Sequence, residues 1–141
     1  VRQALESLAI ELACDRITGE EKDGLKANLD QVESAVRTGD TGAIASADVA
    51  FHDAIVEASG NARLVQLVSN LGEQMYRYRF EYIKDITKHS QIMSEHRIMY
   101  ESIMEKNQEK AAQIVKIHIN NQEEAIMRKI HKDRDAANGH E

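Results

Sequence analysis

The stretch ADVAFHDAIVEASGN, residues 47–61, has the spacing of one amphipathic helix that ends at Gly60. Its apolar positions share one side of that helix; they are Ala47, Phe51, Ala54, Ile55 and Ala58. Asp48 and His52 lie four residues apart, one helical turn, on the same side. A buried carboxylate and a buried imidazole cost free energy unless each finds a partner. The stretch therefore predicts a packed helix with a polar pair in its buried face.

The same helical spacing runs through the rest of the chain. Of its 141 residues, 42% are apolar and 30% are charged, which is typical of a folded domain rather than a disordered segment. The chain has no proline and only seven glycines, so few residues interrupt helices. We therefore expect an all-α fold, an antiparallel bundle of about six helices with short connections. The first three expected helices run from about 2 to 17, from a cap at 18 to about 37, and from 40 or 41 to 59. The fourth runs from a cap at 61 to between 85 and 87. The fifth includes 92–103, and the sixth begins after a cap at 107.

The chain length fits one domain with a single core. We expect residues 1–131 to form this domain and residues 132–141 to form a polar tail that frays. A helical period is already running at Leu5 without a cap or an initiating methionine, so we expect further chain upstream. Cys14, the single cysteine, is expected in the core of a protein from a reducing cytosol. No apolar run approaches a membrane span and no secretion signal is visible, so we expect a cytoplasmic protein without a membrane partner.

The charge of the chain argues against nucleic-acid binding by this segment. Its 24 acidic residues outnumber its 18 lysines and arginines, for a formal net charge of −6. The basic residues are scattered among the acidic ones instead of forming a stripe that could follow phosphates. We interpret them as a solvated surface of mixed charge.

Two further histidines, His96 and His118, fall on the apolar stripes of their own helices. Asn107 lies eleven residues from each of them, so an antiparallel hairpin that turns at Asn107 brings both imidazoles to one level. Asp48 and His52 offer an oxygen and a nitrogen from a third helix. The spacing therefore predicts that Asp48, His52, His96 and His118 converge on one divalent metal ion.

One carboxylate and three imidazoles suit zinc, nickel, iron, cobalt or manganese, and do not suit calcium or magnesium. We expect a single ion, because no histidine follows a glutamate by three residues as a di-iron centre requires. Zinc and nickel are the first candidates. The alternative is a set of hydrogen-bonded core histidines, which is the commoner fate of one histidine on an apolar stripe. His89, His131 and His140 fall near helix ends or in the tail and are expected at the surface.

Three more residues are candidates for binding a small ligand. Arg16 continues the apolar stripe of the first helix, and Arg79 borders the inner face of the fourth. A guanidinium that faces a cavity can bind a carboxylate with two hydrogen bonds, whereas extension to the surface is the alternative. Asn121, one turn after His118 on the inner side, is the third candidate, and the nearby tyrosines are interpreted as core residues.

The chain resembles a known family in three stretches: RQALESLAIELACDRIT at 2–18, DVAFHDAIVEASGN at 48–61 and SEHRIMYESIMEKNQEKAAQIVKIHI at 94–119. They are similar to the C-terminal effector domain, named FCD, of FadR-type GntR transcriptional regulators. The resemblance implies a helical bundle that senses a small organic acid, forms a homodimer and holds a divalent metal through Asp48, His52, His96 and His118. It also implies an N-terminal winged helix-turn-helix that binds DNA, and this chain lacks that domain.

We therefore expect a metal-dependent sensing and dimerising domain of a bacterial regulator, and not an enzyme. One rival is a mononuclear metallohydrolase, because an open metal position can also activate water. A hydrolase needs a general base, and the one inner carboxylate we can place, Asp48, is already a ligand, while Glu95 is expected to point outward beside His96. A purely structural bundle is the other rival.

Overall fold

The computed structural model describes residues 1–139, and within that range every element is helical, as predicted. The elements are α1 (Arg2–Arg16), α2 (Gly19–Thr38), α3 (Thr41–Ala58), α4 (Ala62–Asn70), α5 (Gly72–Ile83), the 3₁₀ turn η1 (Ile86–Lys88), α6 (His89–Met104) and α7 (Gln108–Asn138). None of the helices in residues 1–139 combines the length and hydropathy that crossing a bilayer requires.

Side chains cap the starts of α2, α3, α4 and α7. Thr18, the expected cap of α2, forms a reciprocal capping box with Glu21. Asn61 and Asn107 cap α4 and α7 by accepting a backbone N–H through their side-chain oxygens. Gly60 has φ +64° and follows α3, where a residue with a side chain would be strained.

The fourth expected helix is in fact two helices. The break is at Leu71, whose N–H donates to the carbonyl of Val68 at 3.0 Å in a tight turn before Gly72. The two pieces share one small cluster, to which α4 contributes Leu64 and Val68 and the start of α5 contributes Met75. The end of α5 instead places Tyr82 in the main core.

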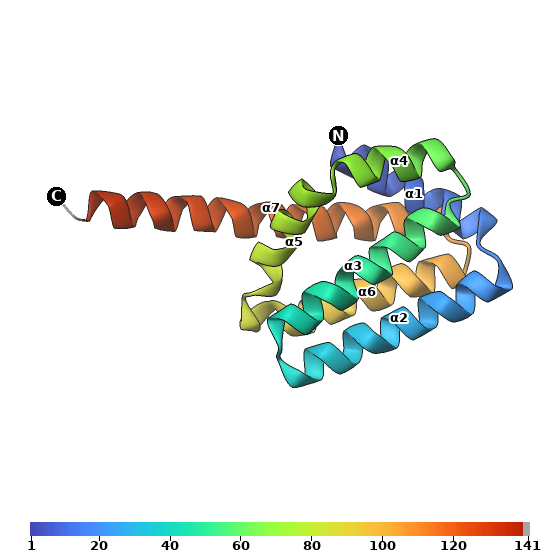
Figure 1. The fold of residues 1–141 in the computed structure, drawn as a ribbon, viewed down its shortest axis with the longest axis horizontal. Coiled ribbons are helices and arrows are strands. Elements are labelled where there is room, and N and C mark those ends of the chain that lie inside the picture. The colour runs from blue at the N-terminus through green and yellow to red at the C-terminus, as the bar shows by residue number, and fades with distance from the viewer. Residues whose placement is uncertain (140–141) are drawn as a thin grey trace.

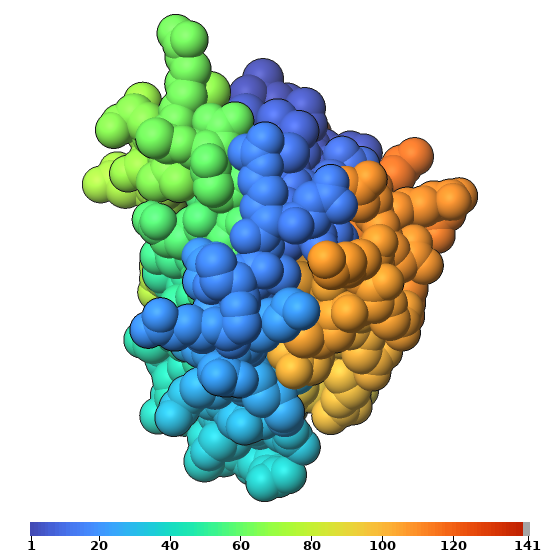
Figure 2. Space-filling model, turned by 90° about the vertical axis from the view of Figure 1, so that its right-hand side faces the viewer, coloured from blue at the N-terminus to red at the C-terminus, as the bar shows by residue number. Residues whose placement is uncertain are grey.

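The bundle is built from antiparallel neighbours (Figure 1). α2 and α3 pack side by side, and α6 and α7 form the predicted hairpin around Asn107. The main core lies between these pairs, and its fully buried members include Phe51, Met99 and Cys14, which fills space in the core as expected. At one end of the bundle, the connection from α1 to α2 lies between the α3–α4 segment and the turn from α6 into α7 (Figure 2).

Helix α7 continues farther than expected. It runs to Asn138, so residues 132–138 of the expected tail are helical, and residues 127–139 are all exposed. This part of α7 projects beyond the bundle (Figure 1). Lys129 contacts Glu81 of α5 at 3.1 Å, and the alanines, lysines and arginines of this part favour a helix by intrinsic propensity. His140 and the end of the expected tail lie outside the described residues.

Candidate metal centre

The structure brings Asp48, His52, His96 and His118 together inside the bundle. The first two lie on α3, the third on α6 and the fourth on α7, and all are buried. The three imidazole rings are mutual neighbours, with centroid separations of 5.3, 5.3 and 5.4 Å. Asp48 Oδ1 lies 2.8 Å from His96 Nε2 and 3.2 Å from His52 Nε2. Ligand atoms of Asp48, His52 and His118 all lie within 4.8 Å of one another.

Both ring nitrogens of His96 face oxygen acceptors. Its Nδ1 lies 2.8 Å from the carbonyl oxygen of Ile92, which can only accept, so Nδ1 carries a proton. In a neutral ring, Nε2 is then also an acceptor, yet it faces Asp48 Oδ1 at 2.8 Å. Two acceptors at that distance require a proton or a metal ion between them. Burial lowers the pKa of His96, but the hydrogen bond and negative charge of Asp48 outweigh it and raise the pKa.

His52 and Asp48 each have one buried atom that lacks a hydrogen-bond partner within residues 1–139. Burial lowers the pKa of His52 to about 4 against the attraction of Asp48, so the ring is neutral near pH 7. Burial raises the pKa of Asp48, but His52, His96 and Arg79 together hold it well below its usual value. His52 Nε2 and Asp48 Oδ2 are buried without hydrogen-bond partners. A neutral imidazole nitrogen and a carboxylate oxygen left unpaired in a buried cluster fit a divalent transition metal.

Glu95 is a buried neighbour of this cluster, and the expectation that it points outward is wrong. Its carboxylate accepts from His118 Nδ1, from the Tyr82 hydroxyl at 2.8 Å and from the Asn121 side-chain amide at 2.8 Å. Burial raises the pKa of Glu95, but these donors, with His118 first, lower it overall. The sequence carried a signal, because Glu95 lies three residues after Ile92 and four before Met99 on one helical stripe.

Arg79, expected at the border of the inner face of its helix, reaches the cluster from α5. It is buried, with Nε 3.7 Å from Asp48 Oδ2, and Nη2 donates to Glu6 Oε1 at 3.3 Å. Glu6 also accepts from Arg2 Nε at 3.0 Å. Neither Arg2 nor Glu6 was predicted, because the buried face of α1 is rotated toward Glu6 and Ile10.

The FCD domain family model matches residues 1–121 of the chain, which include all four residues of the cluster. The chain belongs to the FCD domain family. A similar curated protein is the "Uncharacterized HTH-type transcriptional regulator YdhC" of Bacillus subtilis (strain 168), which is 32% identical over 122 residues. That alignment covers 85% of this chain and 54% of the relative, so the chain spans about half the length of the curated relative it matches. The family resemblance noted in the sequence is confirmed.

Two of the candidate ligand-binding residues of this FCD domain lie apart from the cluster. Arg16 is exposed at the end of α1, where Nη1 donates to the carbonyl of Ser59 at 3.1 Å and the side chain packs on Gly60. It stabilises the end of α3 and does not line the cluster. Asn121 is half-buried and reaches the cluster only through its hydrogen bond to Glu95.

The other histidines outside the cluster divide between core and surface. His89 was expected at the surface but is buried, with Nε2 2.7 Å from the carbonyl oxygen of Ile83. This contact joins the end of α5 to the start of α6 across η1. His131 is exposed on the projecting part of α7, as expected.

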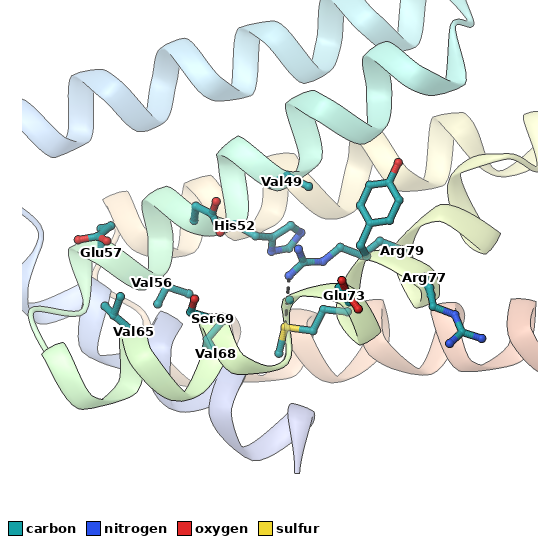
Figure 3. Close-up of a pocket in the computed structure, with 14 residues that line it drawn as sticks. Val49, His52, Val56, Glu57, Val65, Val68, Ser69, Glu73, Arg77 and Arg79 are labelled. Carbon is teal, nitrogen blue, oxygen red and sulfur yellow. Dashed lines mark hydrogen bonds between the residues drawn. The ribbon is translucent and has the colours of Figure 1, made fainter.

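A pocket of the FCD domain opens between α3, α4 and α5 and leads to the cluster (Figure 3). Its volume is about 690 Å³. His52 and Arg79 lie close together in its lining, and Val56, Val65 and Val68 line its apolar side (Figure 3). Arg79 Nε is buried, and its nearest acceptor within residues 1–139 is Asp48 Oδ2 at 3.7 Å, too far for a hydrogen bond. A small molecule in this pocket would therefore meet an imidazole of the cluster and a guanidinium.

Proposed function

We propose that this FCD domain is the effector-sensing and dimerising part of a bacterial transcriptional regulator, and that its sensor is one divalent metal ion held by Asp48, His52, His96 and His118. The contact between His96 Nε2 and Asp48 Oδ1 carries this proposal, since two buried acceptors 2.8 Å apart need a cation or a proton between them. The HTH-type regulator from Bacillus subtilis supports the regulatory role. DNA binding belongs to a domain outside this chain, and the site of action is the cytoplasm.

The proposed effector is a small organic acid. Four protein ligands would close a tetrahedral zinc site, whereas an octahedral ion such as nickel would keep two coordination positions at which a carboxylate could bind. Arg79 supports this assignment, because it lines the pocket beside His52 and a guanidinium suits a carboxylate. The valines beside it give the effector an apolar wall.

The surrounding residues hold the ligands in one orientation. The Ile92 carbonyl fixes the proton of His96 on Nδ1, and the Glu95 carboxylate does the same for His118. Since the four ligands come from α3, α6 and α7, their relative distances depend on how these helices pack. An effector changes DNA affinity only through its different affinity for two packings of the bundle. A small rotation then alters the separation of two DNA-binding domains on their half-sites.

Metal analysis of protein purified without chelator tests the metal centre. We expect stoichiometric zinc or nickel in the wild-type chain and a higher melting temperature when metal is added to the stripped protein. His96→Ala should lose both, whereas His131→Ala on the exposed part of α7 should keep both. A wild-type chain that binds no metal and shows no melting shift would contradict the proposal.

A thermal-shift screen of small organic acids, with and without metal, tests the effector class. We expect stabilising acids to require both the metal and Arg79, so that Arg79→Met removes the shift. Arg16→Ala is the matched control, because Arg16 is an arginine remote from the pocket lining. Acids that stabilise the metal-free protein and the Arg79→Met variant equally would contradict the assignment. Sedimentation equilibrium of the same samples tests the expected homodimer.

A further inference from the structure

Both ring nitrogens of His118 are engaged within the protein. Nδ1 contacts the Glu95 carboxylate, and Nε2 lies 2.9 Å from the side-chain nitrogen of Gln122. Gln122 follows His118 by one turn of α7 and is 1% exposed. The family match ends at Asn121, so Gln122 is the first residue beyond it.

The partners of Gln122 determine which way its amide faces. Arg2 Nη2 lies 2.5 Å from Gln122 Oε1, and a guanidinium can only donate. The oxygen of Gln122 therefore faces Arg2, and its NH₂ group donates to His118 Nε2. That nitrogen must then be the unprotonated one, which agrees with a proton on Nδ1 pointing at Glu95. The hydrogen bonds run in one direction, from Arg2 through Gln122 and His118 to Glu95.

The lone pair that accepts from Gln122 is the one that His118 has left for a metal ion. Nδ1 is held by Glu95, so Nε2 is the nitrogen of His118 that can join Asp48 and His52. One lone pair serves either a hydrogen bond or a metal bond. We propose that Gln122 is a latch on the metal centre, meaning that its carboxamide occupies His118 Nε2 in the metal-free protein. Metal binding at that nitrogen then releases the Gln122 carboxamide and thereby loosens Arg2 in the first turn of α1. This inference rests on the proposed metal centre.

Arg2 is placed to carry that change to α1. Its guanidinium connects Gln122 on α7 with Glu6 on α1 and lies over the Tyr78 ring at 5.2 Å. Within residues 1–139, Arg2 Nη1 is buried without a hydrogen-bond partner. The hydrogen bond from Arg2 Nη2 to Gln122 joins the first turn of α1 to α7, so the loss of Gln122 as an acceptor removes this contact. Metal loading would then be transmitted to the start of α1 as well as to the packing of α3, α6 and α7.

Zinc titration of a latch variant tests the competition. Gln122→Met keeps the length of the side chain but removes the donor to His118. We expect it to bind zinc about three- to tenfold more tightly than wild type, the equivalent of one neutral hydrogen bond that no longer has to be broken. Gln113→Met, at an exposed position on the same helix, should bind zinc as wild type does. Gln122→Met binding equal to or weaker than that of the control would overturn the latch.

Hydrogen exchange of the wild-type chain tests the transmission to α1 without any variant. We expect zinc to speed exchange of the backbone amides of residues 5–8, which depend on the first turn of α1, and to leave α2 unchanged. In Gln122→Met the exchange of 5–8 should be fast with or without zinc. Zinc binding to the wild-type chain without this change at 5–8 would overturn the latch alone. A wild-type chain that binds no zinc would overturn the metal centre and the latch together.

Discussion

Glu95 offers a graded test of how the residues around the ligands support metal binding. It is buried beside the cluster and accepts from His118 Nδ1, Tyr82 and Asn121, but it is not itself one of the four proposed ligands. Glu95→Gln keeps the size of the side chain and an oxygen for His118, but removes the charge. Glu95→Ala removes the acceptor as well. Both changes leave Asp48, His52 and His96 in place.

The expected losses follow from the hydrogen bond between His118 and Glu95. A hydrogen bond to a charged group contributes about 1.5–3 kcal/mol and a neutral one about 1 kcal/mol, so Glu95→Gln should cost about 1 kcal/mol of metal binding. That is about a fivefold weaker affinity, since about 1.4 kcal/mol corresponds to a factor of ten. Glu95→Ala frees the ring of His118, and the loss of such a supporting residue typically costs about 10- to 100-fold in metal affinity.

Competition titration of zinc against a chromogenic chelator measures the series. Wild type should bind most tightly, Glu95→Gln should be weaker and Glu95→Ala the weakest. Glu101→Gln is the matched control, because it removes an exposed carboxylate from the same helix. Circular dichroism of the metal-free proteins should show the helices intact in all four. If both Glu95 variants bind zinc as tightly as the control, the role given to Glu95 is refuted.

Three further predictions concern stability and chemistry. Phe51→Ala should lower the free energy of unfolding by about 3–5 kcal/mol in urea titrations, because Phe51 is fully buried against the His96 ring; no change in the midpoint would contradict its place in the core. Burial raises the pKa of Glu81, but hydrogen bonds from Lys84 and Lys129 lower it overall. Its stabilising contribution is therefore present above the unfolded pKa and lost as the pH falls through the folded pKa. Glu81→Gln should be less stable than wild type at pH 7, and the difference should shrink as the pH falls through the folded pKa of Glu81; a difference that does not change with pH would contradict this. Zinc-loaded wild-type protein should not hydrolyse esters, amides or phosphoesters, and turnover that His96→Ala abolishes would favour the hydrolase instead.

The turnover assay matters because inner carboxylates other than Asp48 are present. From the sequence, we expected that no inner carboxylate would remain free once Asp48 is a ligand. The structure buries Glu95 and Glu6 next to the cluster, so carboxylates are present. Each is occupied by donors from neighbouring helices, and the family of the chain points to regulation. The choice between sensor and enzyme therefore depends on measurement of turnover and not on a count of carboxylates.

The capped helix starts and the convergence of the four proposed ligands were predictable because they depend on local spacing. A cap such as Asn107 acts on a backbone N–H three residues away, and Asp48 and His52 share a face because one turn separates them. His96 and His118 meet because each lies eleven residues from the same turn. Each of these inferences needs one helix or one hairpin. The break at Leu71 was not predicted, because it depends on where two pieces of one apolar stripe find partners.

The missed residues depend on partners that are remote in the sequence. Glu6 pairs with Arg79 across 73 residues, and Arg2 pairs with Gln122 across 120. One apolar stripe in the sequence identifies the side of a helix that packs against one neighbour. Helix α6 packs against α1, α2 and α7, so its buried face is wider than its apolar stripe and includes Glu95. The burial of a charged residue at the edge of an apolar stripe therefore cannot be predicted from its own helix. Such a residue is solvated where no second helix covers it, and it is buried where a second helix brings a hydrogen-bond partner. The opposite outcomes for Arg16 and Arg79 follow the same rule. Arg16 meets only the end of α3, whereas Arg79 meets the carboxylates of α1 and α3, so the neighbouring helix and not the residue type decides which arginine reaches the site.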